Sequence, residues 1–256
     1  MLSALALLAS AFTVACKQGP PPLVDAGMAA CITHDTVVLA GADLDRLRAS
    51  RFVADLGGSA RDLLERYRNA SKLLIAWNGN DLLIVERGLF KTPPPGATIV
   101  EPGLAVTGSP SRISLTVAQH GVGRTGAPGL VDYGVEIGAG SAIWLAVHGG
   151  EALPLSGNLT NLNVLLQDAD YAGVALDLGE AATLRFATRG RTEESAARLE
   201  ERLRGLLSLA AEAEVHRPEI AQLLRATRIQ RSGPSVMATL SASPDVVAKL
   251  LTGFSR

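Results

Sequence analysis

The sequence contains one structural unit twice, in the order strand, helix, hairpin, hairpin, helix. Each copy opens with an apolar segment of strand-forming residues bounded by glycine, residues 35–41 in the first copy and residues 141–149 in the second. Leucines at helical spacing follow each segment. These leucines are Leu44 and Leu47 in the first copy and Leu159 and Leu162 in the second. Such a duplication restricts the chain to two halves that fold alike.

Further strands complete each copy as hairpins. In the first copy, residues 72–77 and 82–87 flank Asn78-Gly79, the dipeptide that best tolerates the positive φ angles of a tight turn. In the second copy, residues 171–178 and 182–189 form the corresponding pair. A second, shorter hairpin follows in each copy, so an antiparallel sheet is expected in both.

A Ser-Pro pair begins the last helix of each copy. Residues 104–112 read LAVTGSPSR, and residues 238–245 read ATLSASPD. Ser109 and Ser243 are suited to cap the free N–H groups of the helix, and a proline at the first helical position has no N–H that needs a partner. This is the closest match between the two copies.

Only the second copy has an insertion, residues 192–226, which predicts two helices. Thr192 and the two glutamates after it favour a helix start, because carboxylates stabilise its positive end. Apolar stripes run along residues 199–210 and 220–224. The first stripe consists of Leu199, Leu203, Leu206 and Ala210. The stripes either dock onto the sheet or form with it a groove for a lipid or a peptide.

These patterns predict the α+β fold class. Residues 34–120 and 141–256 form two similar subdomains, each an antiparallel sheet with helices on one face. Residues 121–140 are rich in glycine and proline and are expected to link them. The two sheets can join into one continuous sheet, which would remove two open edges.

The N-terminus has the pattern of an export signal. Residues 2–15 are uncharged and, apart from Ser3, Ser10 and Thr13, apolar, and about fourteen residues are too few to span a bilayer. Ala15 directly before Cys16 resembles the lipobox of bacterial lipoproteins. That resemblance implies that residues 1–15 are a signal peptide and that Cys16, with a diacylated thiol, is the first residue of the mature chain. An ordinary cleaved signal peptide and a buried first helix are the alternatives.

Residues 16–33 are expected to be a tether between the lipid and the domain, because three consecutive prolines favour an extended spacer. Lys17 resembles the sorting signal for the outer membrane. This favours the periplasmic face of the outer membrane over the inner membrane and over a soluble, secreted form.

Cys31 is either a thiol without a role or, where Cys16 carries no lipid, a disulfide partner for Cys16.

Composition argues against two classes of protein. The chain has 24 Lys and Arg against 25 Asp and Glu, and it lacks the basic stripe of a nucleic-acid-binding protein. Hydrophobic residues make up 47% and charged residues 19%, so most of the chain is not disordered. No nucleic-acid partner is expected.

Residues 121–126, GVGRTG, match GxGxxG, but a helix rather than a strand precedes them. They also resemble the phosphate-binding loop of tyrosine phosphatases, in which a cysteine lies six positions before the arginine. Six positions before Arg124 stands Ala118, so the thiolate nucleophile is missing. We therefore expect Gly121 to end the preceding helix in the left-handed conformation.

The histidines do not predict a metal site. None of the four has another histidine at metal-binding spacing, and only one, His148 at a strand end, is a candidate for a functional role. The others are His34, His120 and His216. No cofactor or metal is expected.

As a whole, the chain resembles uncharacterised bacterial envelope lipoproteins in which an α+β unit is duplicated. The shared features are the lipobox, the proline-rich tether and the Ser-Pro-capped helices. We expect a lipid-anchored cell-envelope protein with a binding or structural role and no catalysis. Its partners would be the membrane and either an envelope protein or an apolar ligand. The alternative is a periplasmic, hydrolase-like enzyme with a site between the two repeats.

Overall fold

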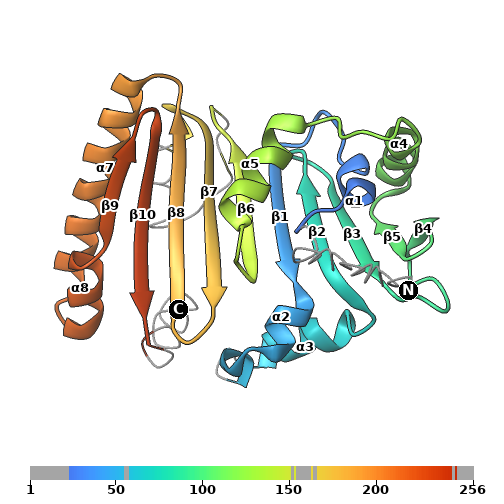
Figure 1. Ribbon diagram of the computed structural model, residues 1–256, viewed down its shortest axis with the longest axis horizontal. Helices are drawn as coiled ribbons and strands as arrows, with labels where there is room; N and C mark the ends of the chain where they lie inside the picture. The colour runs from blue at the N-terminus through green and yellow to red at the C-terminus, as the bar shows by residue number, and fades with distance from the viewer. Residues whose placement is uncertain are drawn as a thin grey trace, which may run out of the picture.

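The computed structural model describes residues 23–54, 58–150, 153, 163, 166–243 and 246. Ten strands form one continuous sheet in which every neighbouring pair is antiparallel (Figure 1). Helices pack on this sheet. The α+β fold class and the joining of the two sheets are therefore confirmed.

The first five strands come from the first repeat. They are β1 (Val38–Asp43), β2 (Ala70–Trp77), β3 (Leu82–Gly88), β4 (Thr98–Glu101) and β5 (Leu104–Thr107). Their spatial order is β4-β5-β3-β2-β1. Asn78 and Gly79 lie in the turn between β2 and β3, where Gly79 has a φ of 99°, so the first predicted hairpin is present.

The second repeat supplies the other five strands. They are β6 (Ile143–His148), β7 (Ala169–Leu178), β8 (Ala182–Gly190), β9 (Arg228–Ser232) and β10 (Ser235–Ala242). Their order is β6-β7-β8-β10-β9, and β1 pairs with β6 at the centre. Counted outward from this junction, both halves have the same strand order, so the duplication in sequence is also a duplication in topology.

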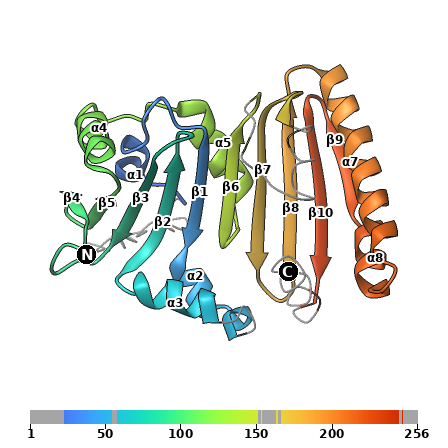
Figure 2. The same ribbon diagram turned by 180° about the vertical axis from the view of Figure 1, so that it is seen from behind.

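Helices lie on both faces of the sheet, whereas one face was expected. They are α1 (Ala26–Ala30), α2 (Leu44–Ala49), η1 (Arg51–Ala54), α3 (Gly58–Arg66), α4 (Pro110–Gly121), α5 (Pro128–Gly138), α7 (Glu193–Ala213) and α8 (Pro218–Arg225). Leu74 packs with α1 and α5, while its neighbour Leu73 packs with α2. Adjacent strand residues point to opposite faces, so α5 and α2 cover different sides. Figures 1 and 2 show these two sides.

Residues 121–140 are not a linker. They contain α5, which packs on β1, β6 and β7 at the junction of the two halves. A Cβ added to Gly134 would lie 2.3 Å from the Trp144 indole, and one added to Gly138 would lie 2.7 Å away. Glycine in this segment therefore allows close helix-to-sheet packing rather than flexibility.

The tether prediction is also wrong from Leu23 onward. Met28, Cys31 and Ile32 are fully buried in the main core, and Asp25 caps α1 by accepting a hydrogen bond from the Met28 N–H. The tether was predicted from the prolines at 20–22, whereas residues 23–33, which follow them, are mostly apolar and join the core. Residues 16–22 and the whole signal segment lie outside the described residues.

The predicted helix starts are partly confirmed. Ser109 caps α4 by accepting a hydrogen bond from the Arg112 N–H, with Pro110 at the first helical position. Gly121 belongs to α4, and it is Gly123 that has the positive φ, 75°. The glycine in the left-handed conformation therefore lies two residues after Gly121, for which this conformation was predicted. The helices expected at Leu159, Leu162 and Pro244 fall on residues outside the described ones.

Candidate functional site

The first half of α7 is docked on the sheet. Thr192 and Ser195 each accept a hydrogen bond from the other's main-chain N–H, which holds the start of the helix. The next turns bury their apolar side chains against Phe186, Val236 and Ala238. The buried helix residues are Ala196, Leu199 and Leu203. Docking on the sheet, one of the two interpretations of the first stripe, therefore holds here.

The second half of α7 leaves a hollow. Leu206 and Leu207 are half-buried, and Ala211 is buried in place of the predicted Ala210, which is exposed. Between this part of α7, α8 and β9 lies a hollow of about 450 Å³. Its apolar lining is Leu207, Leu224 and Ile229, and its charged lining is Arg204 and Arg225. The predicted groove between these helices and the sheet is thus present, and its occupant stays a prediction.

Positive charge exceeds negative charge around the hollow. Glu200 of α7 binds Arg204 at 2.7 Å and Arg231 of β9 at 3.1 Å. Arg225 and Arg228 are exposed and have no ion-pair partner among the described residues. Apolar side chains beside unpaired guanidinium groups suit a ligand with an apolar part and an anionic part.

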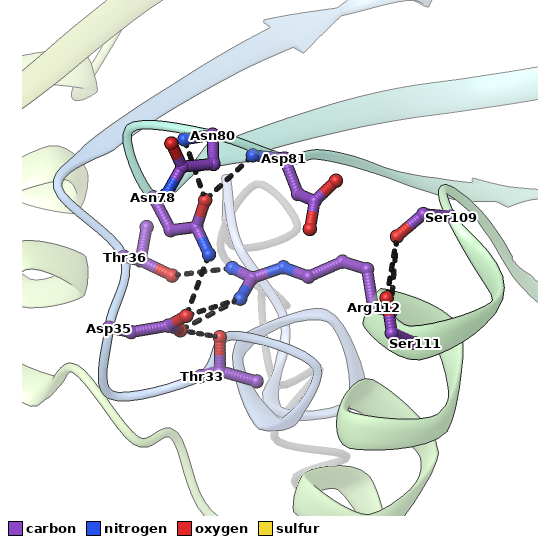
Figure 3. Close-up of polar contacts among 9 residues, drawn as sticks. All are labelled: Thr33, Asp35, Thr36, Asn78, Asn80, Asp81, Ser109, Ser111 and Arg112. Carbon is purple, nitrogen blue, oxygen red and sulfur yellow. Dashed lines mark hydrogen bonds and ion pairs between the residues drawn. The ribbon is translucent and has the colours of Figure 1, made fainter.

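A second polar cluster surrounds Arg112, whose side chain is only 1% exposed (Figure 3). Its Nη1 lies 2.8 Å from both carboxylate oxygens of Asp35, and its Nη2 donates to the Thr36 hydroxyl. The Asn78 amide and the Thr33 hydroxyl also donate to Asp35. The cluster joins α4, the turn between β2 and β3, and the segment before β1.

Hydrogen bonding keeps this carboxylate ionised. Burial alone would raise the pKa of Asp35, but hydrogen bonds from Arg112, Asn78 and Thr33 hold it well below its usual range. A carboxylate in this state is a poor general base near neutral pH, because such a base needs a pKa close to the working pH. We therefore assign the cluster a role in stability.

His148, the one histidine singled out by sequence, lies in an aromatic cluster beside α5. Its ring meets Tyr171 edge-on with centroids 5.3 Å apart, and Tyr171 stacks on Tyr133 at 5.4 Å. Its Nδ1 lies 2.9 Å from the Gly149 carbonyl oxygen. These contacts account for its position by packing, and a functional role for it stays a prediction.

The other candidate side chains are dispersed. His34 lines a hollow of about 250 Å³ next to Asp35, and His120 lies 3.3 Å from Glu101. Cys31 is a free, fully buried thiol, and burial raises its pKa to about 12, so it is neither exposed nor ionised near neutral pH. His216 is exposed in the turn after α7.

The GVGRTG segment is held by the fold of the first repeat. The Gln119 side-chain amide donates to the Arg124 carbonyl, and the Gly126 N–H donates to the Ile32 carbonyl at 2.7 Å. Within the described ranges, no group of three or more His, Cys, Asp or Glu side chains is placed to hold a metal ion. Cys16, the predicted lipid attachment site, lies outside these ranges.

None of the described helices combines the length and the apolar character that a membrane span requires.

Comparison with known proteins identifies the fold. No protein-family model and no curated protein sequence matches this chain. Crystal form I of TP0453, a Treponema pallidum protein, has a TM-score of 0.52 at 11% identity over 93% of this chain and 99% of that chain. Form III gives 0.53 at 11% over 93% and 100%, and form IV gives 0.51 at 10% over 87% and 95%. At this identity the likeness shows a shared fold.

Neither Arg112 nor Arg225 stands out in the sequence. The local pattern offers only that Arg112 shares a helix face with Thr116 at i+4; the structure buries both, whereas the apolar Leu115 and Val117 are exposed. A charged residue on the inward face of a short helix predicts a buried partner. Arg225 and Arg228 carry no such local signal, since only the packing of α8 beside β9 separates them from other surface arginines.

Proposed function

We propose that the protein is a lipid-anchored cell-envelope protein on the periplasmic face of the outer membrane. It binds a partner through its second repeat and catalyses no reaction. The proposed binding rests on the hollow formed by α7, α8 and β9, which is lined by both apolar and polar side chains and by Arg225. In the described part of the first repeat, no helix lies between β3 and β4, the place that corresponds to these two helices.

The proposed membrane anchor rests on the N-terminal sequence and on the contacts of Asp25 near the start of the domain. Ala15-Cys16 resembles a lipobox, and Asp25 follows Cys16 by nine residues in the sequence. Asp25 is fixed there by two hydrogen bonds from Arg87, at 2.8 and 2.6 Å. Acyl chains on Cys16 would thus be joined to a firmly held point of the domain, each buried CH₂ contributing about 0.8 kcal/mol to membrane affinity.

Replacement of the predicted lipidation site tests the anchor. Cys16→Ala, or treatment of cells with globomycin, should cause the precursor to accumulate and the protein to leave the membrane fraction. Cys31→Ala is the matched control, because it removes the other cysteine from a buried site and should leave fractionation unchanged. Membrane association that is the same with and without Cys16 would contradict the anchor.

Site-specific cross-linking tests the proposed binding of a partner by the second repeat. A photoreactive side chain at Thr227, inside the hollow, should give a discrete adduct in intact cells. The same group at Gln119, which lines the smaller hollow next to Asp35, is the control. Adducts of equal yield at both positions would show that the second repeat has no special part in binding.

The enzyme hypothesis placed a site between the two repeats. The described junction is filled on the α5 side by Trp144, which is 1% exposed and packs against Gly41, Gly134 and Gly138. This filled junction supports the binding role over the hydrolase-like alternative.

A further inference from the structure

Strand β9 is an open edge of the sheet. It pairs with β10 in unbroken register from Arg228 to Ser232, and no other described strand lies beside it (Figure 1). Four of its five residues are exposed. An antiparallel strand at a sheet edge leaves the N–H and C=O groups of alternate residues unpaired on its outer side. Such an edge can accept another extended chain.

The turn between β9 and β10 determines which residues face outward. Ser232 and Ser235 flank a two-residue turn, Gly233-Pro234, in which Gly233 has a φ of 53°. In a hairpin of this length the flanking residues form a hydrogen-bonded pair, so the main chain of Ser232 faces β10. The main-chain groups of Ile229 and Arg231 therefore face away from the sheet.

The two faces of this edge have different chemistry. Ile229 points to the α7 side, where it lines the hollow with Leu207 and Leu224. Arg228, one residue earlier, points to the opposite face. An added strand would alternate in the same way, with one set of side chains at the hollow and the other set beside Arg228.

The charge of the edge selects its partner. Arg225, Arg228 and Arg231 are all exposed, and Glu200, which binds Arg231, also neutralises Arg204. A second copy paired edge to edge would bring like charges together, which is unfavourable. Acidic side chains on the incoming strand would instead find cations.

We propose that β9 binds an extended segment of a partner protein in which acidic and apolar residues alternate, added to the sheet as a further antiparallel or parallel strand. The acidic side chains lie beside Arg228, and an apolar side chain enters the hollow between α7 and α8. This inference rests on the proposed binding function and names the chemistry of its partner.

Synthetic peptides test it directly. Full-length protein in detergent micelles is titrated with three labelled octapeptides that alternate valine with glutamate, serine or lysine, and fluorescence anisotropy is measured. The valine–glutamate peptide should bind about tenfold or more tightly than the valine–lysine peptide, and salt should weaken it. Equal affinity for all three peptides, or no saturable binding at millimolar concentration, would overturn the proposal.

Two sets of variants separate charge from strand addition. Arg228→Glu should weaken acidic-peptide binding by about tenfold, whereas Arg124→Glu, at an exposed arginine between the two repeats, should not. Arg231→Pro removes an outward N–H and should abolish binding while β9 remains paired with β10.

Hydrogen exchange gives a readout that does not depend on a proline variant. The amides of Ile229 and Arg231 should exchange more slowly when the acidic peptide is bound. Binding without this protection would overturn strand addition. The test uses purified protein, so a failure of lipidation at Cys16 would appear only in cell fractionation and would leave these results unchanged.

Discussion

The two outer strands of the sheet stand at equivalent places in the two repeats, yet they are built differently. β4 has four residues, a shift of register between Ile99 and Glu101, and a carboxylate at Glu101 that is held by Arg87. Three prolines precede it. These features block pairing at a sheet edge. β9 has regular register, exposed arginines and a hollow beside it, so the duplication preserved the sheet while the insertion changed what one edge can bind.

The two repeats also anchor their central strands differently. Before β1, Arg112 of α4 holds the carboxylate of Asp35. Before β6, Arg185 of β8 donates to the Ala139 carbonyl at 2.7 Å and the Ser141 hydroxyl at 2.8 Å. In the second repeat, the position that corresponds to Arg112, three residues after the serine of the Ser-Pro pair, is occupied by Val246 rather than by an arginine. Each half therefore fixes its first strand with an arginine, and among the described residues the ion pair at this place belongs to the first half.

The largest effect is expected at the junction that the two repeats share. Trp144→Ala should lower the free energy of unfolding by about 3–5 kcal/mol, because it leaves a cavity between β1, β6 and α5. Trp77→Ala, at a half-buried position in the first repeat, is the control and should cost less. Chemical denaturation of both variants measures the difference. A smaller loss for Trp144 than for Trp77 would mean that the halves do not depend on this contact.

A smaller effect should distinguish the two arginine anchors. Arg112→Met should lower the free energy of unfolding by about 2 kcal/mol. This loss is smaller than the loss expected for a fully buried ion pair, because the Asp35 side chain is 36% exposed. Arg185→Met removes hydrogen bonds to neutral oxygens and should cost about 1 kcal/mol.

The two variants should also differ in pH dependence. The lowered pKa of Asp35 means that the unfolded chain binds its proton more readily than the folded one, so this stabilisation is complete above about pH 5 and is lost at lower pH. In Arg112→Met the loss of stability between about pH 5 and pH 2 should be shallower than in the parent protein. Arg185→Met should keep the parent slope. Identical slopes in all three proteins would show that Asp35 does not contribute through this ion pair.

The smallest effect concerns the helix that only the second repeat has. Thr192→Ala should lower the free energy of unfolding by about 1 kcal/mol, because it removes the cap of α7. Thr192→Ser should keep most of this stability, since serine can cap the helix in the same way. Hydrogen exchange should quicken in α7 and leave α4 unchanged. Ser109→Ala is the reciprocal variant and should affect α4 alone. Faster exchange in both helices from either change would contradict independent capping.

Sequence predicted the elements whose signals are local. The turn at Asn78-Gly79, the capping of α4 by Ser109 and the start of α7 after Thr192 depend on residues within a few positions of one another. Sequence failed for α5 and α1, where glycine and proline suggested a linker and a tether. The glycines of α5 are explained by packing on the sheet, since Gly134 and Gly138 make room for the indole of Trp144.

What the sequence determines by itself is the duplicated α+β unit, its hairpins and the inserted pair of amphipathic helices, because period, turn chemistry and capping act over short distances. The tertiary structure decided that β1 and β6 join the halves into one sheet, that Arg112 finds Asp35 and that the second half of α7 forms a hollow with α8 and β9. Each of these depends on contacts between residues far apart in the chain, and no local pattern encodes which of the available partners will meet.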